Sequence, residues 1–129
     1  MTSLEELRNQ FIVGPDVIRN RIEELIKKAL PFCVITENGT VHISVKGLGA
    51  RNQIKLVLAA RYLAAELSTA IPGEVGIPDL VSSTGLPVNQ IRARMNDAIK
   101  EHFASSPRKG AYVVNPHRIE SFLDSLEKE

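Results

Sequence analysis

One stretch of the sequence predicts most of the architecture: Ile77-Pro78-Asp79-Leu80-Val81-Ser82-Ser83-Thr84-Gly85-Leu86-Pro87-Val88-Asn89-Gln90-Ile91-Arg92-Ala93-Arg94-Met95. Apolar residues recur at helical spacing on both sides of Gly85, which predicts a short helix over 77–84 and a longer helix over 88–102. A tight turn between two steeply crossing helices needs a residue that tolerates a positive φ, and Gly85 supplies it. The inward stripe that we expect on the longer helix is Val88, Ile91, Met95, Ala98 or Ile99, and Phe103.

A hairpin and a final helix are predicted after this pair. Residues 104–115 contain a typical hairpin tip, Pro107-Arg108-Lys109-Gly110, and residues 111–114 form the return strand. Asn115 can cap a last helix that has Pro116 at its first position. The buried face of that helix is predicted to be Ile119, Phe122, Leu123 and Leu126.

Two further helices and a hairpin are predicted before residue 48. Ser3 and Glu6 form a capping box for a first helix that ends near Val13, and Pro15 is suited to the first position of a second helix. Asn38-Gly39 predicts a two-residue type I′ turn. That turn sets three pairs opposite each other: Thr36 and Val41, Val34 and Ile43, and Phe32 and Val45. The buried face would then carry these residues, with Cys33, Ile35, His42 and Ser44 on the other face.

These elements predict an α+β, mostly helical chain with two parts. Residues 1–47 hold the N-terminal helices and hairpin, and residues 48–129 hold the rest. The second part begins with a helix over 50–68 that is rich in Ala and Leu and carries little charge, so we expect it at the centre of the fold.

The second part also resembles a known family. Residues 77–95 look like a helix-turn-helix, and with the following hairpin residues 50–127 resemble the winged-helix transcription regulators of prokaryotes, bacterial or archaeal. The matching residues are Ile77, Leu80 and Val81 in the first helix, Gly85 and Leu86 in the turn, and Val88, Ile91 and Met95 beneath the second helix. The resemblance implies a cytoplasmic transcription regulator that binds double-stranded DNA sequence-specifically.

The helix over 88–102 carries side chains suited to reading DNA. Helical periodicity turns Gln90, Ala93, Arg94 and Asp97 outward, with Asn89, Arg92 and Asn96 along the flanks. Arginine pairs with guanine, and asparagine or glutamine with adenine. We expect base contacts from Asn89, Gln90 and Arg94, phosphate contacts from Arg92 and from Thr84 or Ser83, and wing contacts from Arg108 and Lys109.

The charge distribution favours this assignment. The chain has 16 Lys+Arg and 15 Asp+Glu, so its net charge of +1 excludes binding to nucleic acid by bulk charge alone. Charge is nevertheless segregated: residues 85–118 hold six basic and two acidic residues, a local net of +4, whereas residues 119–129 hold one lysine and four acidic residues, a net of −3.

Other function classes lack support in the sequence. No apolar run approaches the roughly 20 residues of a membrane helix, and the acidic start Met1–Glu6 is unlike a signal peptide. A lone Cys33 suits a reducing compartment, and three scattered histidines form no metal site. We find no catalytic arrangement and no phosphate-binding glycine loop, and we expect neither an enzyme nor a cofactor or small-molecule substrate.

Two questions stay open at this point. The nearly neutral residues 1–47 either cover the 50–68 helix within one chain or form a homodimer across a twofold axis, which would set two DNA half-sites about 34–36 Å apart. The winged helix could also be a protein–protein interaction module in a larger assembly, because fold does not determine function. Its low net charge and its outward Ala93 favour that second reading.

Overall fold

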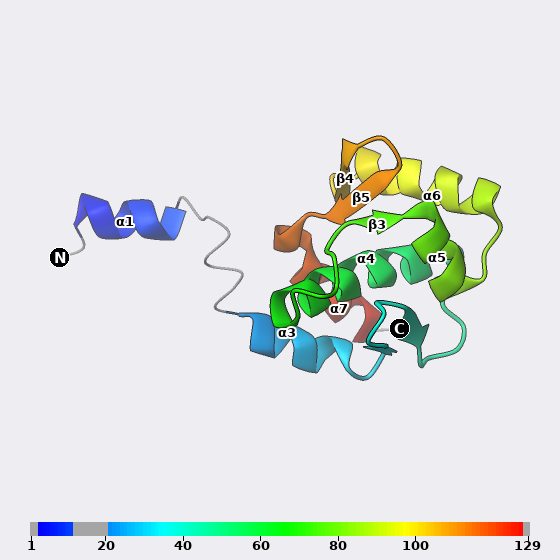
Figure 1. Cartoon of the computed structure of the whole chain (residues 1–129). Coiled ribbons are helices and arrows are strands. Elements are labelled where there is room, and N and C mark those ends of the chain that lie inside the picture. The colour runs from blue at the N-terminus through cyan, green and yellow to red at the C-terminus, as the bar shows by residue number, and fades with distance from the viewer. Residues whose placement is uncertain (1–2, 12–20, 128–129) are drawn as a thin grey trace.

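The computed structural model describes residues 3–11 and 21–127 of the 129-residue chain (Figure 1). Its elements are α1 (Leu4–Phe11), α3 (Ile22–Ala29), β1 (Cys33–Ile35), β2 (Val41–Ile43), α4 (Ala50–Leu67), β3 (Val75–Gly76), α5 (Ile77–Thr84), α6 (Val88–Lys100), β4 (Ala104–Arg108), β5 (Ala111–Val114), a 3-10 turn (Pro116–Arg118) and α7 (Ile119–Glu127). The expected α+β class with a majority of helix is confirmed. The predicted start of the second helix at Pro15 lies outside the described residues.

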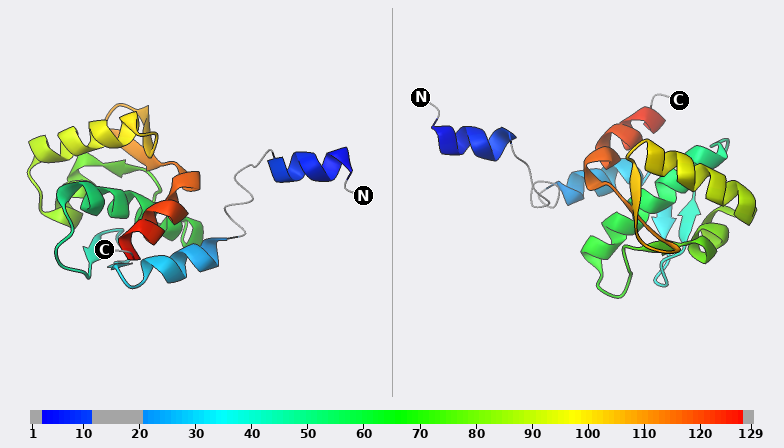
Figure 2. Two further views of the ribbon diagram at one scale, coloured as in Figure 1. Left: turned by 180° about the vertical axis from the view of Figure 1, so that it is seen from behind. Right: turned by 90° about the horizontal axis from the view of Figure 1, so that it is seen from above.

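α4 lies at the centre of the molecule, as its composition predicts. Its middle is buried all round, and the exposed fraction is at most 2% from Leu56 to Ala60. α3 and the β1–β2 hairpin cover α4 on one side, and α5, α6 and β5 cover it on the other (Figures 1 and 2). Because a helix that is apolar all round needs cover on every side, α4 organises the remaining elements around itself.

The turn between α5 and α6 has the predicted form. Gly85 adopts φ 72°, and its N–H donates to the carbonyl of Val81 at 2.8 Å. At the other end of α5, the carboxylate of Asp79 accepts a 2.9 Å hydrogen bond from the N–H of Gly76. α5 is therefore capped at both ends, and α6 begins at Val88, after the short turn that Gly85 starts.

The register predicted for the first hairpin is wrong by one residue. Cys33 pairs with Ile43, and Ile35 pairs with Val41, so the buried face carries these four side chains. The loop contains three residues, not two: the N–H of Thr36 donates to the carbonyl of Thr40 at 2.9 Å, and Gly39, but not Asn38, has a positive φ. One extra loop residue moves the side chains of β1 to the opposite face, which leaves Val34 exposed, whereas Val41 and Ile43 of β2 face the core and His42 faces solvent as expected.

The second hairpin forms a three-stranded sheet in the order β3-β5-β4. Gly110 has φ 79° at its tip, next to Lys109, as the sequence indicates. Pro107 is tolerated because β4 is an edge strand, where a missing N–H breaks no ladder. The two-residue strand β3 is an addition to the elements expected from the sequence.

The N-terminal segment from α3 onward packs into the same core as the C-terminal helix. Leu25 of α3 and Leu126 of α7 belong to one cluster of buried apolar residues. Lys28 also contacts Asp124 at 2.5 Å, and Arg21 pairs with Glu120. α3 and the first hairpin therefore cover α4 within one chain, which is the first of the two alternatives considered for residues 1–47.

α7 has the four buried residues that the sequence indicates. Ile119, Phe122, Leu123 and Leu126 are all at most 7% exposed. The side chain of Asn115 caps the start of this segment by accepting a 3.2 Å hydrogen bond from the N–H of His117. No helix within residues 3–11 and 21–127 is long and apolar enough to span a bilayer.

Arg61 is the buried charged residue of the described structure, with 3% exposure. Its guanidinium donates to the carbonyls of Pro72 and Glu74 at 2.9 and 3.1 Å, and it lies 3.5 Å from the carboxylate of Asp79. These bonds attach α4 to the loop before β3 and to the start of α5. Arg61 therefore helps to fix the position of this loop, in addition to the pairing of β3 with β5.

Replacement of Arg61 tests this attachment. Arg61→Ala removes the buried donor of two part-buried hydrogen bonds to these carbonyls, and we expect it to lower the free energy of unfolding by about 2–4 kcal/mol. Arg118→Ala, which removes an exposed arginine, should change it by less than about 0.5 kcal/mol. Urea denaturation followed by circular dichroism measures both. Equal midpoints for the two variants would show that Arg61 does not hold the loop.

Candidate nucleic-acid interface

α6 packs on the body along one stripe and faces solvent along the opposite one. Ile91, Met95 and Ala98 are at most 2% exposed and contact the core. The prediction that Val88 points inward is wrong, because it is 44% exposed. The stripe is centred on positions i, i+4 and i+7 from Ile91, and Val88 lies at its edge in the first turn.

α6 is thus rotated slightly about its axis relative to the expected orientation. This changes which side chains lie at the centre of its solvent-facing side. The residues opposite the buried stripe are Asn89, Ala93, Asn96 and Lys100, all exposed. Gln90 and Arg92 are exposed on the two flanks, whereas Arg94 and Asp97 are half-buried. The structure therefore brings Asn89 and Asn96 to the centre of the face and moves Arg94 away from it.

Arg94 is engaged within its own helix. Its Nε lies 3.2 Å from the carboxylate of Asp97, one turn further along α6. The side chain of Arg94 is 41% exposed, so its guanidinium is accessible only in part. A new ligand at Arg94 would have to compete with Asp97.

The hydroxyl groups expected to contact phosphate are occupied by the fold. Thr84 Oγ1 donates to the carbonyl of Leu80 at 2.6 Å and accepts from the N–H of Leu86 at 3.2 Å. Ser83 Oγ accepts a 3.0 Å hydrogen bond from the N–H of Val41 in the first hairpin. Both hydroxyl groups therefore form hydrogen bonds within the fold: Thr84 in α5 and the turn before α6, and Ser83 between α5 and the first hairpin.

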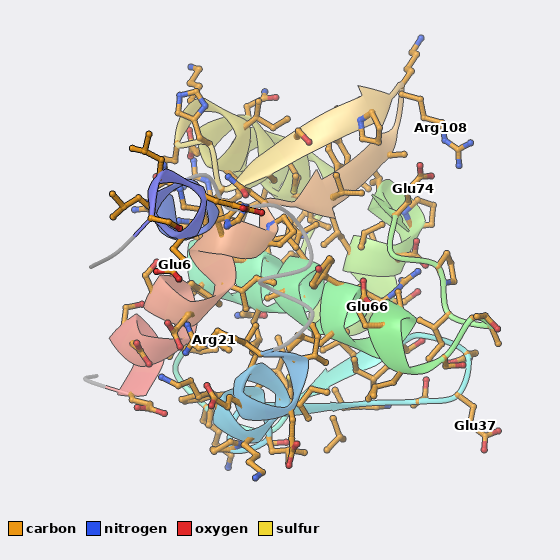
Figure 3. The ribbon with its side chains drawn as sticks, turned by 90° about the vertical axis from the view of Figure 1, so that its left-hand side faces the viewer. Glu6, Arg21, Glu37, Glu66, Glu74 and Arg108 are labelled. Atoms are coloured by element: carbon orange, nitrogen blue, oxygen red, sulfur yellow. The ribbon has the colours of Figure 1, made fainter. Side chains whose placement is uncertain are left out.

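The β4–β5 hairpin carries Arg108 and Lys109 at its exposed tip. Arg108 donates to the carboxylate of Glu74 at 2.6 Å, and Figure 3 shows both side chains at the same end of the molecule. Glu74 lies in the loop before β3, outside residues 85–118, whose local net charge is +4. Sequence reasoning missed it because only the pairing of β3 with β5 brings that loop to the hairpin.

α6 and the β4–β5 hairpin lie side by side on one face of the molecule. Figure 1 shows both along its upper edge, and the view from above in Figure 2 shows them next to each other. Within the described part of the chain, Arg92 and Lys109 form no ion pair, so both present an uncompensated positive charge. The arrangement is a polar helix face with a basic hairpin beside it.

An acidic residue at the end of α6 is neutralised by α4. Glu101 accepts hydrogen bonds from Lys55 at 2.6 Å and from Arg51. Lys55 and then Arg51 hold the pKa of the Glu101 carboxyl below its usual value. Because Glu101 is paired with α4, the carboxylates that reduce the positive charge of α6 and the hairpin are mainly those of Asp97 and Glu74.

Cys33 lies in a buried, apolar position rather than in a reactive one. It is 4% exposed, and its thiol faces the carbonyl of Ala29 at 3.8 Å. Burial raises the pKa of this thiol to about 11, so it stays protonated at neutral pH. Among the residues that the structure describes, no three histidine, cysteine or acidic side chains gather as metal ligands.

The reactivity of Cys33 follows from this position. At pH 8 we expect the native protein to react with the disulfide reagent DTNB at least about a hundredfold more slowly than the urea-unfolded protein, because the native thiolate fraction is lower. Absorbance of the released thiolate measures both rates. Rapid, complete labelling of the folded chain would contradict the buried position.

Comparison with known protein families, with curated protein sequences and with solved structures finds no match to this chain.

Proposed function

We propose that this protein binds double-stranded DNA sequence-specifically, with α6 as the recognition helix and the β4–β5 hairpin as the wing, and that it regulates transcription. One observation carries the proposal: the solvent-facing stripe of α6 is polar and lies beside a basic hairpin tip on one face. A helix of this kind fits the major groove of B-DNA, which is about 12 Å wide. The hairpin is then positioned to reach the backbone or the adjacent minor groove.

Base reading is assigned to the amide side chains of α6. Asn89 and Gln90 lie in its first turn, and Asn96 lies two turns further along the same exposed side. An amide can form two hydrogen bonds with adenine in the major groove, with a discrimination of about 1–3 kcal/mol against a wrong base. The exposed methyl group of Ala93 between them suits the methyl group of thymine.

Phosphate binding is assigned to Arg92 and Lys109, whose charges are uncompensated. Arg94 and Arg108 add to it only by exchanging Asp97 and Glu74 for a phosphate oxygen. The N-terminus of α6 also directs backbone N–H groups toward the DNA, which favours a phosphate there.

A protein-interaction module is the second candidate. The ion pairs at Arg94 and Arg108 reduce the positive charge of the face, and Ala93 lies at its centre. Both features suit a protein partner. Retention on a random duplex at about 0.15 M salt separates the two candidates, because an interaction module would show essentially none.

Gln90→Ala tests base reading. We expect it to lose about 1–3 kcal/mol of preference at one or two positions of the site while binding to random duplex stays nearly unchanged. Sites selected from a random duplex library, followed by anisotropy titrations with single-base variants, measure this. An unaltered site preference would show that Gln90 does not read a base.

Lys109→Ala tests the wing. Loss of one phosphate contact should weaken binding to all sequences alike and reduce the slope of log K against log salt by about one unit. Lys27→Ala is the matched control, because Lys27 is an exposed lysine on α3, at the opposite side of α4 from α6. If both variants kept the wild-type salt slope, the hairpin tip would not contact DNA.

A further inference from the structure

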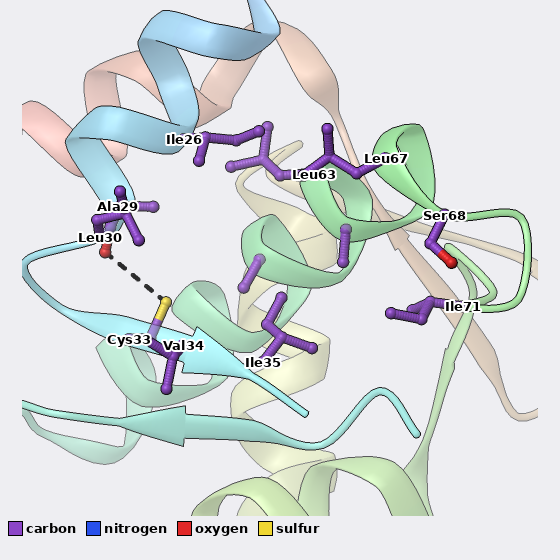
Figure 4. A pocket seen from close by; sticks show the side chains of 12 residues that line it. Ile26, Ala29, Leu30, Cys33, Val34, Ile35, Leu63, Leu67, Ser68 and Ile71 are labelled. Atoms are coloured by element: carbon purple, nitrogen blue, oxygen red, sulfur yellow. Dashed lines mark hydrogen bonds between the residues drawn. The ribbon is translucent and has the colours of Figure 1, made fainter. Parts of the chain in front are cut away.

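An apolar groove opens on the side of the molecule away from α6. It has a volume of about 350 Å³ and lies between α3, β1 and the C-terminal half of α4 (Figure 4). Its walls are almost entirely aliphatic, with Ile26, Leu63 and Ile71 among the residues that line it. A groove of this size and composition accepts an apolar side chain or two, not a charged ligand.

The rim of the groove exposes large apolar side chains. Leu30 is 56% exposed, Val34 is 52% exposed and Leu67 is 70% exposed, and all three line the groove. They make up half of the six large apolar residues that the described structure leaves exposed. A cluster of such residues around a concave surface is typical of an interaction site.

Two more of these six residues lie on α1. Leu4 is 85% exposed and Leu7 is 47% exposed, one turn apart on the same face of the helix. α1 has eight residues, and a helix of that length is marginal in water without tertiary contacts. α1 therefore needs an apolar partner, and the groove needs an apolar occupant.

The position of α1 indicates that the occupant of the groove comes from a second chain. α1 stands away from the body of its own chain, whose groove is open (Figures 1 and 2). The nine residues 12–20 that follow it span at most about 30–32 Å, which is enough for α1 to reach across to a neighbouring molecule.

We propose that α1 of one chain docks in the groove of a second copy, with Leu4 and Leu7 between Leu30 and Leu67. The exchange is reciprocal about a twofold axis, so each copy supplies one helix and one groove. The groove and α6 lie at opposite sides of α4, so the dimer leaves both α6 faces open (Figure 1). The proposal holds whether or not α6 binds DNA.

Oligomeric state provides the first test. Light scattering on the full chain should give twice the 14.2 kDa mass of one chain at tens of micromolar. Leu4→Ser/Leu7→Ser on the helix side and Leu67→Ser on the groove side should each weaken the dimer by at least about tenfold. Val88→Ser is the matched control, because it removes the one large exposed apolar residue of the described structure outside α1 and the groove. A monomeric wild-type chain, or a dimer that only Val88→Ser weakens, overturns the proposal.

Disulfide trapping identifies the occupant directly. Two single-cysteine chains are mixed, each in a Cys33→Ala background, one with Leu7→Cys and one with Leu67→Cys. Oxidation should give a disulfide-linked heterodimer, whereas Leu7→Cys mixed with Val88→Cys should give little. In one chain that carries both cysteines, a fast-migrating monomer as the main product would place α1 in its own groove and contradict the exchange. Circular dichroism verifies that each variant is folded.

Discussion

Burial of α4 is the constraint on which the rest of the structure depends. Its side chains from Leu56 to Ala60 are removed from water on every side of the helix, and no single element could cover them. α3 and the first hairpin cover one side, while α5, α6 and β5 cover the other. α6 is thus held by an apolar stripe against the core, and its polar residues are left outside as a consequence of packing. The same constraint places α3 and β1 far from α6, so the groove and the polar face are separate surfaces.

Most of the described helices could be predicted from the sequence, because they have an apolar period and an end signal, although α6 ends two residues before its expected end at 102. Gly85 marks the end of α5, Asn115 caps the start of the last helical segment, and α4 matches its expected range within one residue. The first hairpin was harder. Asn38-Gly39 is compatible with a two-residue or a three-residue loop, and both strands carry apolar residues on either face. The choice between the registers depends on what packs beneath the hairpin.

The candidate site could be predicted in residue type and location but not in its electrostatics. The position of Asn89, Gln90, Arg92 and Lys109 on exposed parts of α6 and the hairpin follows from periodicity and turn chemistry. The ion pair between Arg108 and Glu74 does not, because it joins residues far apart in the chain. The rotation of α6 is a similar case: Ala98 and Ile99 are both apolar, and only contact with α4 selects Ala98 for the core.

The ion pair between Glu74 and Arg108 bears on how fast a polyanion is captured. A carboxylate beside the guanidinium cancels much of its field beyond a Debye length, which is about 8 Å in physiological salt. An approaching chain of phosphates therefore experiences little attraction from Arg108 until the two surfaces nearly touch. Arg108 would then add little to the rate of association, and any electrostatic acceleration would come from Arg92 and Lys109, which form no ion pair in the described part of the chain.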